Sequence, residues 1–470
     1  MRFSHLSFLL LLILPILLYF VTHGAVMSDE GNILHSAEKI LNGKLPYRDF
    51  HFQTTPASLF LTVIPFSLLK SSILSSRLLV LAVYLISSIL IFKTVFIATK
   101  NNLYATISIL IFISWAPSHV NFSYPTVYAI AFTILCCYLL MKFMQTRRKR
   151  YLFFAGISSF LVLLSEHHIG IALILPVVIF FSVKHARSFS IVSIFLYAYL
   201  WSFILFCIYL LSNQSFPQFV SDFFRSPIQF NNSLFAGSVF QNFLNFMPLI
   251  ISVASFVLLY IRRRFHLLFL PSILVFFFTA IVFSQDYVQS MLFMSLLGIP
   301  VALYLRYNVS TNVRLLLLLF SCILIFSGFY TGLFKGYYNT STSLVENSNF
   351  FPHPKVNIFI EKKTEHELSE LIDVADKYTG PKDYVFINSY DPMLYFILNR
   401  KDPINETYIL AEQSPKKYYA QVVGNLVAKR VRILLLKNGE IDSLPIKNFI
   451  RNNYSFTKTV GHFDIYLLRS

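Results

Sequence analysis

Residues 5–31 read HLSFLLLLILPILLYFVTHGAVMSDEG, an apolar run that ends shortly before two adjacent acids, Asp29 and Glu30. The run is about 20 residues long, which is the length that an α-helix needs to cross a bilayer. A cleaved signal peptide also begins with a basic residue and an apolar stretch, but this length favours a retained anchor. In either case the segment with Asp29 and Glu30 emerges on the far side of the membrane.

The whole chain has the composition of a membrane protein. Hydrophobic residues make up 56% of the 470 positions and charged residues only 13%, whereas an ordinary soluble domain is roughly a quarter charged. Apolar runs near spanning length recur as far as about residue 330 and predict eleven membrane spans. These predicted spans cover residues 7–26, 78–98, 102–117, 124–143, 152–165, 169–183, 189–211, 246–261, 266–283, 288–305 and 314–333.

The last stretch of the chain alternates helix-like and strand-like patterns instead. Helices are predicted at 365–377 and 418–428, and strands at 384–388, 431–436, 456–460 and 463–468. The predicted fold class is therefore mainly α: a polytopic membrane helix bundle over residues 1–333, followed by a small α/β domain over residues 334–470.

The net charge of +17 is distributed as in a membrane protein, and no nucleic-acid partner is expected. Of the 39 Lys and Arg, 21 precede Phe334, and only seven acids do. With the N-terminus inside, the basic breaks at 100, 147–150, 184–187, 262–264 and 306–314 all become cytoplasmic, which obeys the positive-inside rule. The seven acids then all lie outside, so the polar chemistry faces outward. This topology predicts a multi-pass protein of the plasma (inner) membrane with an extracytoplasmic C-terminal domain.

Two of the outer loops are long, residues 27–77 and 211–241. The first contains an apolar stretch, 56–69, that is short for a span and is predicted to be an interfacial helix. Taken as a span, it would reverse every later loop and place the basic residues 147–150 outside, so the charge pattern argues against that reading.

The first outer loop carries the most informative residues. Adjacent acids at the mouth of a span are costly to keep unless they meet water or partners. Asp29 and Glu30 have two readings: they cap a helix over 32–41, where acids complement the helix dipole, or they carry chemistry. The loop continues with LNGKLPYRDF, residues 41–50, and then with a proline that opens the interfacial helix.

These elements together resemble a known family. An acidic pair after the first span, an amphipathic helix, the stretch GKLPYRDF and an interfacial helix followed by Arg77 are similar to the multispan GT-C glycosyltransferases. Within them the sequence resembles the branch of dolichyl-phosphate-mannose protein mannosyltransferases and aminoarabinose transferases. The resemblance is specific over about the first 80 residues and looser over the rest. It implies transfer of a sugar from a polyprenyl-phosphate donor to a lipid, glycan or protein acceptor at the outer face.

The resemblance also implies roles for particular residues. Asp29 matches the catalytic base of that family, and Glu30 would orient the sugar or Asp29. Arg48, Arg77 and Arg225 are the outward arginines suited to hold phosphate oxygens. For each arginine the alternative is a structural role with the charged end at the interface.

Further substrate contacts are predicted for Asp49 and His51 in the first loop and for the turn Glu166-His167-His168. That turn could contact the lipid phosphate, relay a proton or ligate a metal. Adjacent residues on a helix point about 100° apart, which makes consecutive histidines poor chelators of one ion. No cofactor is therefore certain, and a divalent metal is possible but not indicated.

Two other functions fit a multispan chain. A transporter or lipid flippase would show repeats or ionisable residues near mid-membrane, whereas the acids here gather at one face. A sensor or scaffold whose tail binds a partner would leave the Asp29-Glu30 loop unexplained. The transferase interpretation is therefore favoured.

Overall fold

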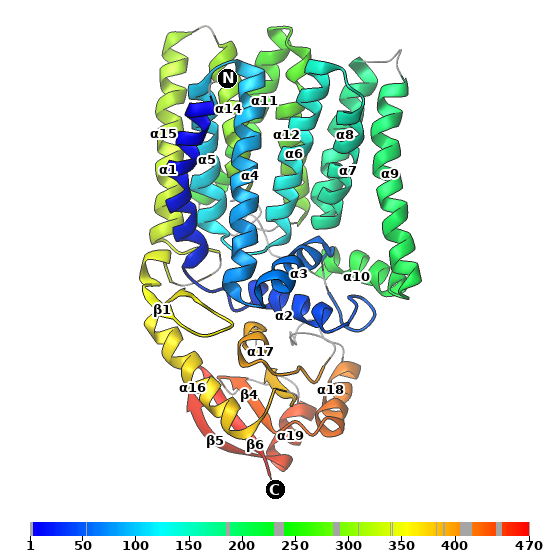
Figure 1. The fold of residues 1–470 in the computed structure, drawn as a ribbon, viewed down its shortest axis with the longest axis vertical. Coiled ribbons are helices and arrows are strands. Elements are labelled where there is room, and N and C mark those ends of the chain that lie inside the picture. Colours follow the sequence, from blue (N-terminus) through cyan, green and yellow to red (C-terminus); the bar gives the residue numbers. More distant parts are fainter. Residues whose placement is uncertain are drawn as a thin grey trace.

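The computed structural model describes residues 3–469 except for 53, 185–188, 230–238, 285–291, 309, 339, 341, 382, 389–390, 405–415 and 439–443. The described chain forms two layers stacked along its long axis, a bundle of long helices and a smaller α/β domain (Figure 1). The N-terminus lies at the far end of the bundle, and the C-terminus lies at the opposite end of the molecule.

Each of the eleven predicted spans overlaps a helix of the bundle. These helices are α1 (Phe3–Thr22), α4 (Ile73–Thr99), α5 (Asn102–His119), α6 (Pro125–Thr146), α7 (Arg150–Ser165), α8 (His167–Lys184), α9 (Phe189–Ser212), α11 (Val239–Ile261), α12 (Phe269–Ser284), α14 (Gly298–Tyr307) and α15 (Thr311–Phe334). Five described helices are long and apolar enough to cross a membrane by themselves, and four more of the eleven are shorter apolar helices. The polytopic membrane fold is confirmed.

Several bundle helices begin or end at polar residues. Ser72 and Ser75 form a capping box at the start of α4, and the side chain of Asn101 accepts two backbone N–H groups at the start of α5. α4 and α6 end at Lys100 and Arg147, which both adopt a left-handed conformation that stops the helix. The breaks that carry basic residues in the sequence are thus true helix ends.

Three shorter helices lie across the end of the bundle that faces the C-terminal domain (Figure 1). They are α2 (Asp29–Leu41), α3 (Ala57–Leu69) and α10 (Phe216–Gln229). The predicted interfacial helix corresponds to α3. The helix expected over 32–41 begins three residues earlier, so both loop acids lie in its first turn.

The C-terminal domain is built on a four-stranded sheet of order β3-β4-β6-β5. β3 (Val385–Asn388) and β4 (Ile433–Lys437) are parallel, and β6 (Phe463–Leu468) pairs antiparallel with both β4 and β5 (Tyr454–Val460). The predicted strands and the final hairpin are confirmed. The hairpin turns at Gly461, whose φ of +55° favours glycine.

The sheet is covered by helices and preceded by a small hairpin. The helices are α16 (Lys362–Tyr378), α17 (Met393–Leu398), α18 (Lys416–Ala428) and α19 (Leu444–Asn453), and the hairpin strands are β1 (Asn349–Phe351) and β2 (Ile358–Ile360). α16 and α18 agree with helices predicted from the sequence, whereas the hairpin, α17 and α19 were not predicted.

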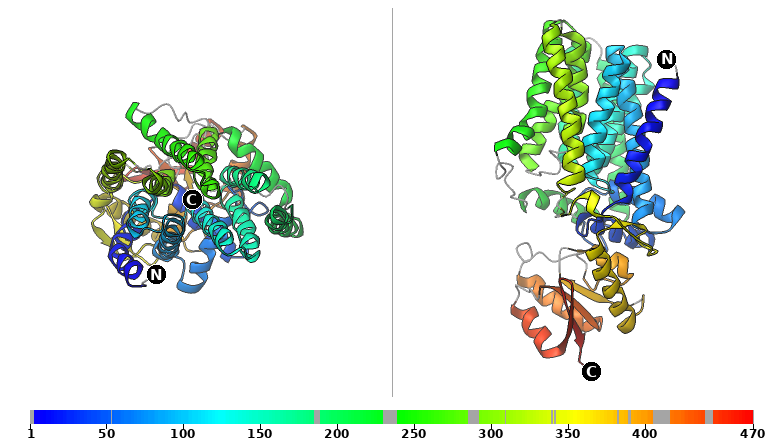
Figure 2. Two further views of the ribbon diagram at one scale, coloured as in Figure 1. Left: turned by 90° about the horizontal axis from the view of Figure 1, so that it is seen from above. Right: turned by 90° about the vertical axis from the view of Figure 1, so that its left-hand side faces the viewer.

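α17 is the element that brings this domain against the first loop. Met393 N–H donates to the carbonyl of Met27 at 3.1 Å. A Cβ at Gly31 would lie 2.2 Å from the Met393 nitrogen, so α2 approaches α17 as closely as only glycine allows. Figure 2 shows the α/β domain continuing the long axis of the bundle below these contacts.

Candidate active site

Asp29 stands at the start of α2, where the helix dipole favours a negative charge. The hydroxyl of Tyr338, just beyond α15, donates a hydrogen bond to Asp29 Oδ2. Tyr338 is itself held edge-on against the rings of Phe122 and Tyr124, at centroid distances of 5.0 and 5.5 Å. Segments distant in sequence therefore meet at this carboxyl group.

The environment of Asp29 raises its pKa above the ordinary value because burial disfavours the charged form. The Tyr338 hydrogen bond opposes this effect by stabilising the carboxylate. A carboxylate with a raised pKa is a stronger base than an exposed aspartate, so Asp29 is suited to accept a proton from a hydroxyl group.

Glu30 and Arg77 form a buried ion pair beside Asp29. Arg77 Nε and Nη2 donate hydrogen bonds of 2.7 Å to the two oxygens of Glu30, and both side chains have no exposed surface. Val26 N–H adds a hydrogen bond of 3.1 Å to Glu30. Arg77 Nη1 donates to the carbonyls of His23 at 3.1 Å and Val21 at 3.4 Å. The pair fastens the end of α1, the start of α2 and the start of α4 to one another.

Arg77 and Glu30 are thus occupied by each other and by backbone groups. The guanidinium of Arg77 is engaged by Glu30 and by two carbonyls and has no exposed surface. Glu30 lies in the same first turn of α2 as Asp29. The predicted contact of Arg77 with a donor phosphate stays a prediction.

Arg48 remains open to solvent. Its Nε and Nη2 donate hydrogen bonds of 2.9 and 2.8 Å to the carboxylate of Asp49, and the Arg48 side chain is 41% exposed. The Arg48 hydrogen bond lowers the pKa of Asp49, and the Leu45 N–H contributes in the same direction. Arg48 is the outward arginine of the first loop that an anionic ligand can reach, while the side chain of Arg225 on α10 lies outside the described residues.

A pocket opens between the first loop, α10 and α8. Its walls combine aromatic rings, hydroxyl groups, an imidazole and a carboxylate, from Tyr47, Phe52, Thr54, Thr55, His167, Phe219, Asp222 and Phe223. Gln218 Nε2 donates to Asp222 Oδ1 at 2.6 Å and contacts His51 Nδ1 at 3.0 Å. His51 Nδ1 lies 3.6 Å from Asp222 Oδ2. The predicted site residue His51 thus lies beside this pocket, next to its lining residue Asp222.

Asp222 was missed as a site residue. The sequence did offer a clue to Asp222, because it is one of only seven acids before Phe334 and lies in the second long outer loop. Its segment forms the strongly amphipathic helix α10, which carries polar side chains toward the first loop.

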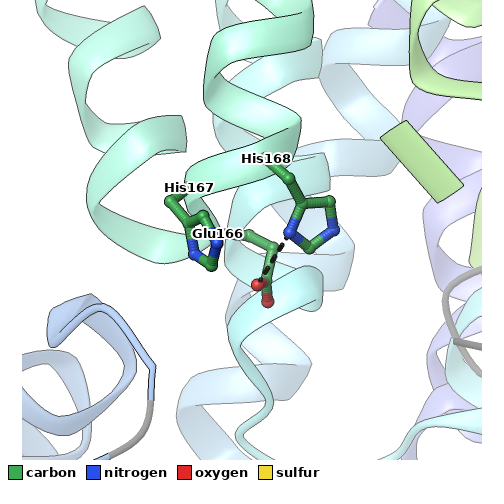
Figure 3. Close-up of side chains that lie close together, drawn as sticks. All are labelled: Glu166, His167 and His168. Atoms are coloured by element: carbon green, nitrogen blue, oxygen red, sulfur yellow. Dashed lines mark ion pairs between the residues drawn. The ribbon is translucent and has the colours of Figure 1, made fainter. Parts of the chain in front are cut away.

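The predicted trio Glu166, His167 and His168 lies where α7 ends and α8 begins (Figure 3). His168 Nδ1 is 3.4 Å from Glu166 Oε1, and Thr126 Oγ1 donates to Glu166 Oε2 at 3.4 Å. The His167 ring packs against Phe223 of α10 at 4.8 Å. The trio therefore adjoins the pocket through His167.

The C-terminal domain adds a further buried charge that sequence reasoning missed. Asp402 forms an ion pair and a hydrogen bond with Lys39, and its carboxylate lies 3.4 Å from the imidazole of His35; both partners are on α2. Burial alone would raise the pKa of Asp402, but the ammonium of Lys39 and the imidazole of His35 hold it well below its usual range. The helix that begins with Asp29 is thereby tied to both layers of the protein.

Comparison with known proteins identifies the fold. No protein-family model matches the sequence, and no curated protein matches it significantly. Solved structures do match. ArnT from Cupriavidus metallidurans bound to undecaprenyl phosphate aligns with a TM-score of 0.59 at 13% identity, over 98% of this chain and 97% of that one. This chain has the fold of ArnT.

The apo structure of ArnT from the same organism gives a similar result, with a TM-score of 0.58, 16% identity and the same coverage. The predicted multispan architecture with a C-terminal domain therefore matches the fold of a solved structure along nearly the whole chain. At this identity the shared property is the fold, and the roles of individual side chains rest on the geometry of this protein.

Proposed function

We propose that this protein is a glycosyltransferase that moves a sugar from a polyprenyl-phosphate carrier to an acceptor hydroxyl at the outer face of the membrane. The observation that supports this most is the environment of Asp29, a carboxyl group with a raised pKa held at the start of α2. It occurs in a fold shared with ArnT, which binds undecaprenyl phosphate.

The reaction assigns one proton transfer to Asp29. Its carboxylate accepts the proton of the acceptor hydroxyl while the acceptor oxygen attacks the anomeric carbon. The new carbon–oxygen bond forms as the bond from the anomeric carbon to the phosphate oxygen breaks. Polyprenyl phosphate leaves with that electron pair. A positioned base contributes about 10² to 10⁴ in rate to such a step.

The other residues hold the reacting groups. Arg48 is placed to neutralise the phosphate, because its exposed guanidinium can exchange Asp49 for a ligand oxygen. His51 and Asp222 suit sugar hydroxyl groups, since an imidazole and a carboxylate offer complementary hydrogen-bonding atoms. The same pocket has a volume of about 10 Å³, room for roughly one water molecule, so a sugar ring would need its aromatic walls to move apart. These roles assign the first loop and α10 to donor binding.

The direct test is transfer by the purified protein in detergent. Radiolabelled polyprenyl-phosphate sugars would be supplied with cell-envelope acceptors, and label in a product other than the donor would be followed. A mass-spectrometric comparison of lipid-linked sugars and surface glycans with and without the protein then identifies the sugar and the acceptor. Failure to consume any lipid-linked donor in either experiment would contradict the proposal.

The proposed reaction requires the α/β domain to lie outside the plasma membrane. His366 is suited to a labelling test because its side chain is 79% exposed. A cysteine there, in a background where Cys207 and Cys322 are serine, should react with an impermeant thiol reagent in intact cells. If the cysteine is labelled only after the membrane is opened, the α/β domain lies on the cytoplasmic side and the predicted topology is wrong.

A further inference from the structure

The turn between α7 and α8 gathers three metal-ligating side chains from consecutive residues. α7 ends at Ser165, Glu166 adopts an extended backbone with φ −149° and ψ 108°, and α8 begins at His167. The break releases only Glu166 from the helix, whereas His167 and His168 are neighbours in the first turn of α8, with ring centroids 5.3 Å apart and nearly perpendicular rings. Figure 3 shows the result, with the two imidazole rings on either side of the carboxylate.

The distances suit a small metal ion. One ligand atom from each of Glu166, His167 and His168 lies within 4.8 Å of the others. Zinc binds nitrogen and oxygen at about 2.0–2.2 Å, so two ligands of a tetrahedral site are about 3.3 Å apart. The separation of 3.4 Å between His168 Nδ1 and Glu166 Oε1 already matches that edge. The His167 nitrogen lies within 4.8 Å of both other ligand atoms, so a rotamer change is required to bring all three to that spacing.

The surroundings also fit a metal site. The side chains of Glu166 and His168 are only 7% and 18% exposed, so a cation there would be largely shielded from water. Thr126 Oγ1 donates to the Glu166 oxygen that faces away from His168, which orients the carboxylate as outer hydrogen bonds do at metal centres. His167 lines the pocket with Asp222, so the site adjoins that pocket.

We propose that Glu166, His167 and His168 form a zinc-binding site with one open coordination position. Two imidazoles and one carboxylate are a ligand set that suits Zn²⁺, and Mg²⁺ or Ca²⁺ prefers oxygen ligands alone. The single negative charge of Glu166 is offset by the divalent ion. The site does not depend on the proposed glycosyl transfer, although an oxygen of a bound phosphate would suit its open position.

Metal binding can be measured without any substrate. Full-length protein in detergent would be treated with a chelator, exchanged into metal-free buffer and titrated with Zn²⁺ by calorimetry, with bound metal counted by mass spectrometry. The expected stoichiometry is one Zn²⁺ per chain. Replacement by Co²⁺ should give the intense visible absorption of a four-coordinate site. Absence of both signals in the wild type would overturn the proposal.

Variants assign the ligands. Glu166→Gln, His167→Ala and His168→Ala should each weaken Zn²⁺ binding by at least about 100-fold, since even outer hydrogen-bond partners are worth about 10- to 100-fold. Thr126→Ala should cost about 10-fold. His366→Ala is the matched control, because His366 Nε2 lies 3.0 Å from Glu370 in an exposed pair. Unchanged affinity in His168→Ala, or a loss of binding in the control, would contradict the site.

Discussion

Arg77 and Glu30 face each other across a sequence separation of 47 residues as a fully buried pair joined by two hydrogen bonds of 2.7 Å. Taking both charges out of water is costly, and further hydrogen bonds to the pair help to offset that cost. The carbonyls of His23 and Val21 and the N–H of Val26 meet that need. The pair makes the helix turn that carries Asp29 rigid.

Breaking this pair should destabilise the protein. Glu30→Gln or Arg77→Ala leaves an uncompensated buried charge, which costs about 3–5 kcal/mol. The measurement is the midpoint of thermal unfolding in detergent, followed by size exclusion after heating. Arg48→Ala is a matched control because it breaks an exposed arginine–carboxylate pair, which contributes little. Equal midpoints for all three variants would show that the buried pair has no structural role.

Asp402 should hold the α/β domain against α2. Asp402→Asn leaves the ammonium of Lys39 buried with a neutral partner, so we expect a loss of about 3–5 kcal/mol and faster proteolysis between α17 and α18. The control is Asp376→Asn, whose carboxylate pairs with Arg400 but is 65% exposed. If the two variants are cut at the same rate, the buried contact does not fix the domain.

The direction of the pKa shift of Asp402 determines how this contact depends on pH. The pKa of Asp402 is lower in the folded protein than in the unfolded chain, so its stabilisation is fully present above the unfolded pKa of about 3.9. It is lost as the pH falls through the folded value. Wild-type docking should therefore be insensitive to pH near neutrality and weaken only in strong acid.

The bundle helices could be predicted from the sequence because each depends on a local run of apolar residues. Each apolar run of spanning length became a helix, and basic breaks such as Lys100 and Arg147 became helix ends. Short elements were not accessible in this way. The six residues of α17, Met393–Leu398, are all apolar, and periodicity cannot distinguish such a run from a buried strand.

The site was only partly predictable because its contacts are non-local. The first loop and its acids were found from their position after a span. The pairing of Lys39 with Asp402 joins residues 363 positions apart, and no local pattern encodes it. The approach of Glu166 to His167 and His168 was also not foreseen, because it depends on the chain break that places this carboxylate outside the helix carrying both histidines.

Arg48 is expected to bind the donor phosphate. Arg48→Ala should raise the donor concentration needed for half-maximal transfer by about tenfold or more, because a charge-assisted contact is lost. Arg451→Ala in α19, at a residue exposed on the α/β domain, is the control for removal of one positive charge. An unchanged donor dependence in Arg48→Ala would remove this arginine from the site.

Asp29 is expected to be essential for turnover. Asp29→Asn keeps the size of the side chain but cannot accept a proton from the acceptor hydroxyl, so turnover should fall by about 10² or more. Donor binding should persist because the phosphate contacts are unchanged. Near-normal transfer by a folded Asp29→Asn protein would favour the reading in which this residue only caps α2.

A variant of Tyr338 can show whether Asp29 acts as a general base or only caps α2. Asp29 must be charged to act, and burial raises its pKa, so the acid limb of the turnover profile should lie at a higher pH than for an exposed aspartate. The Tyr338 hydroxyl stabilises the charged form. Tyr338→Phe removes that hydrogen bond and should move the acid limb further toward high pH, with much of the turnover retained at the alkaline plateau.

Tyr337→Phe is the neighbouring control, since the Tyr337 hydroxyl donates to the carbonyl of Ala25 instead. If the profile of Tyr338→Phe coincides with that of the wild type, or if Tyr337→Phe shifts it equally, the ionisation that limits turnover does not belong to Asp29.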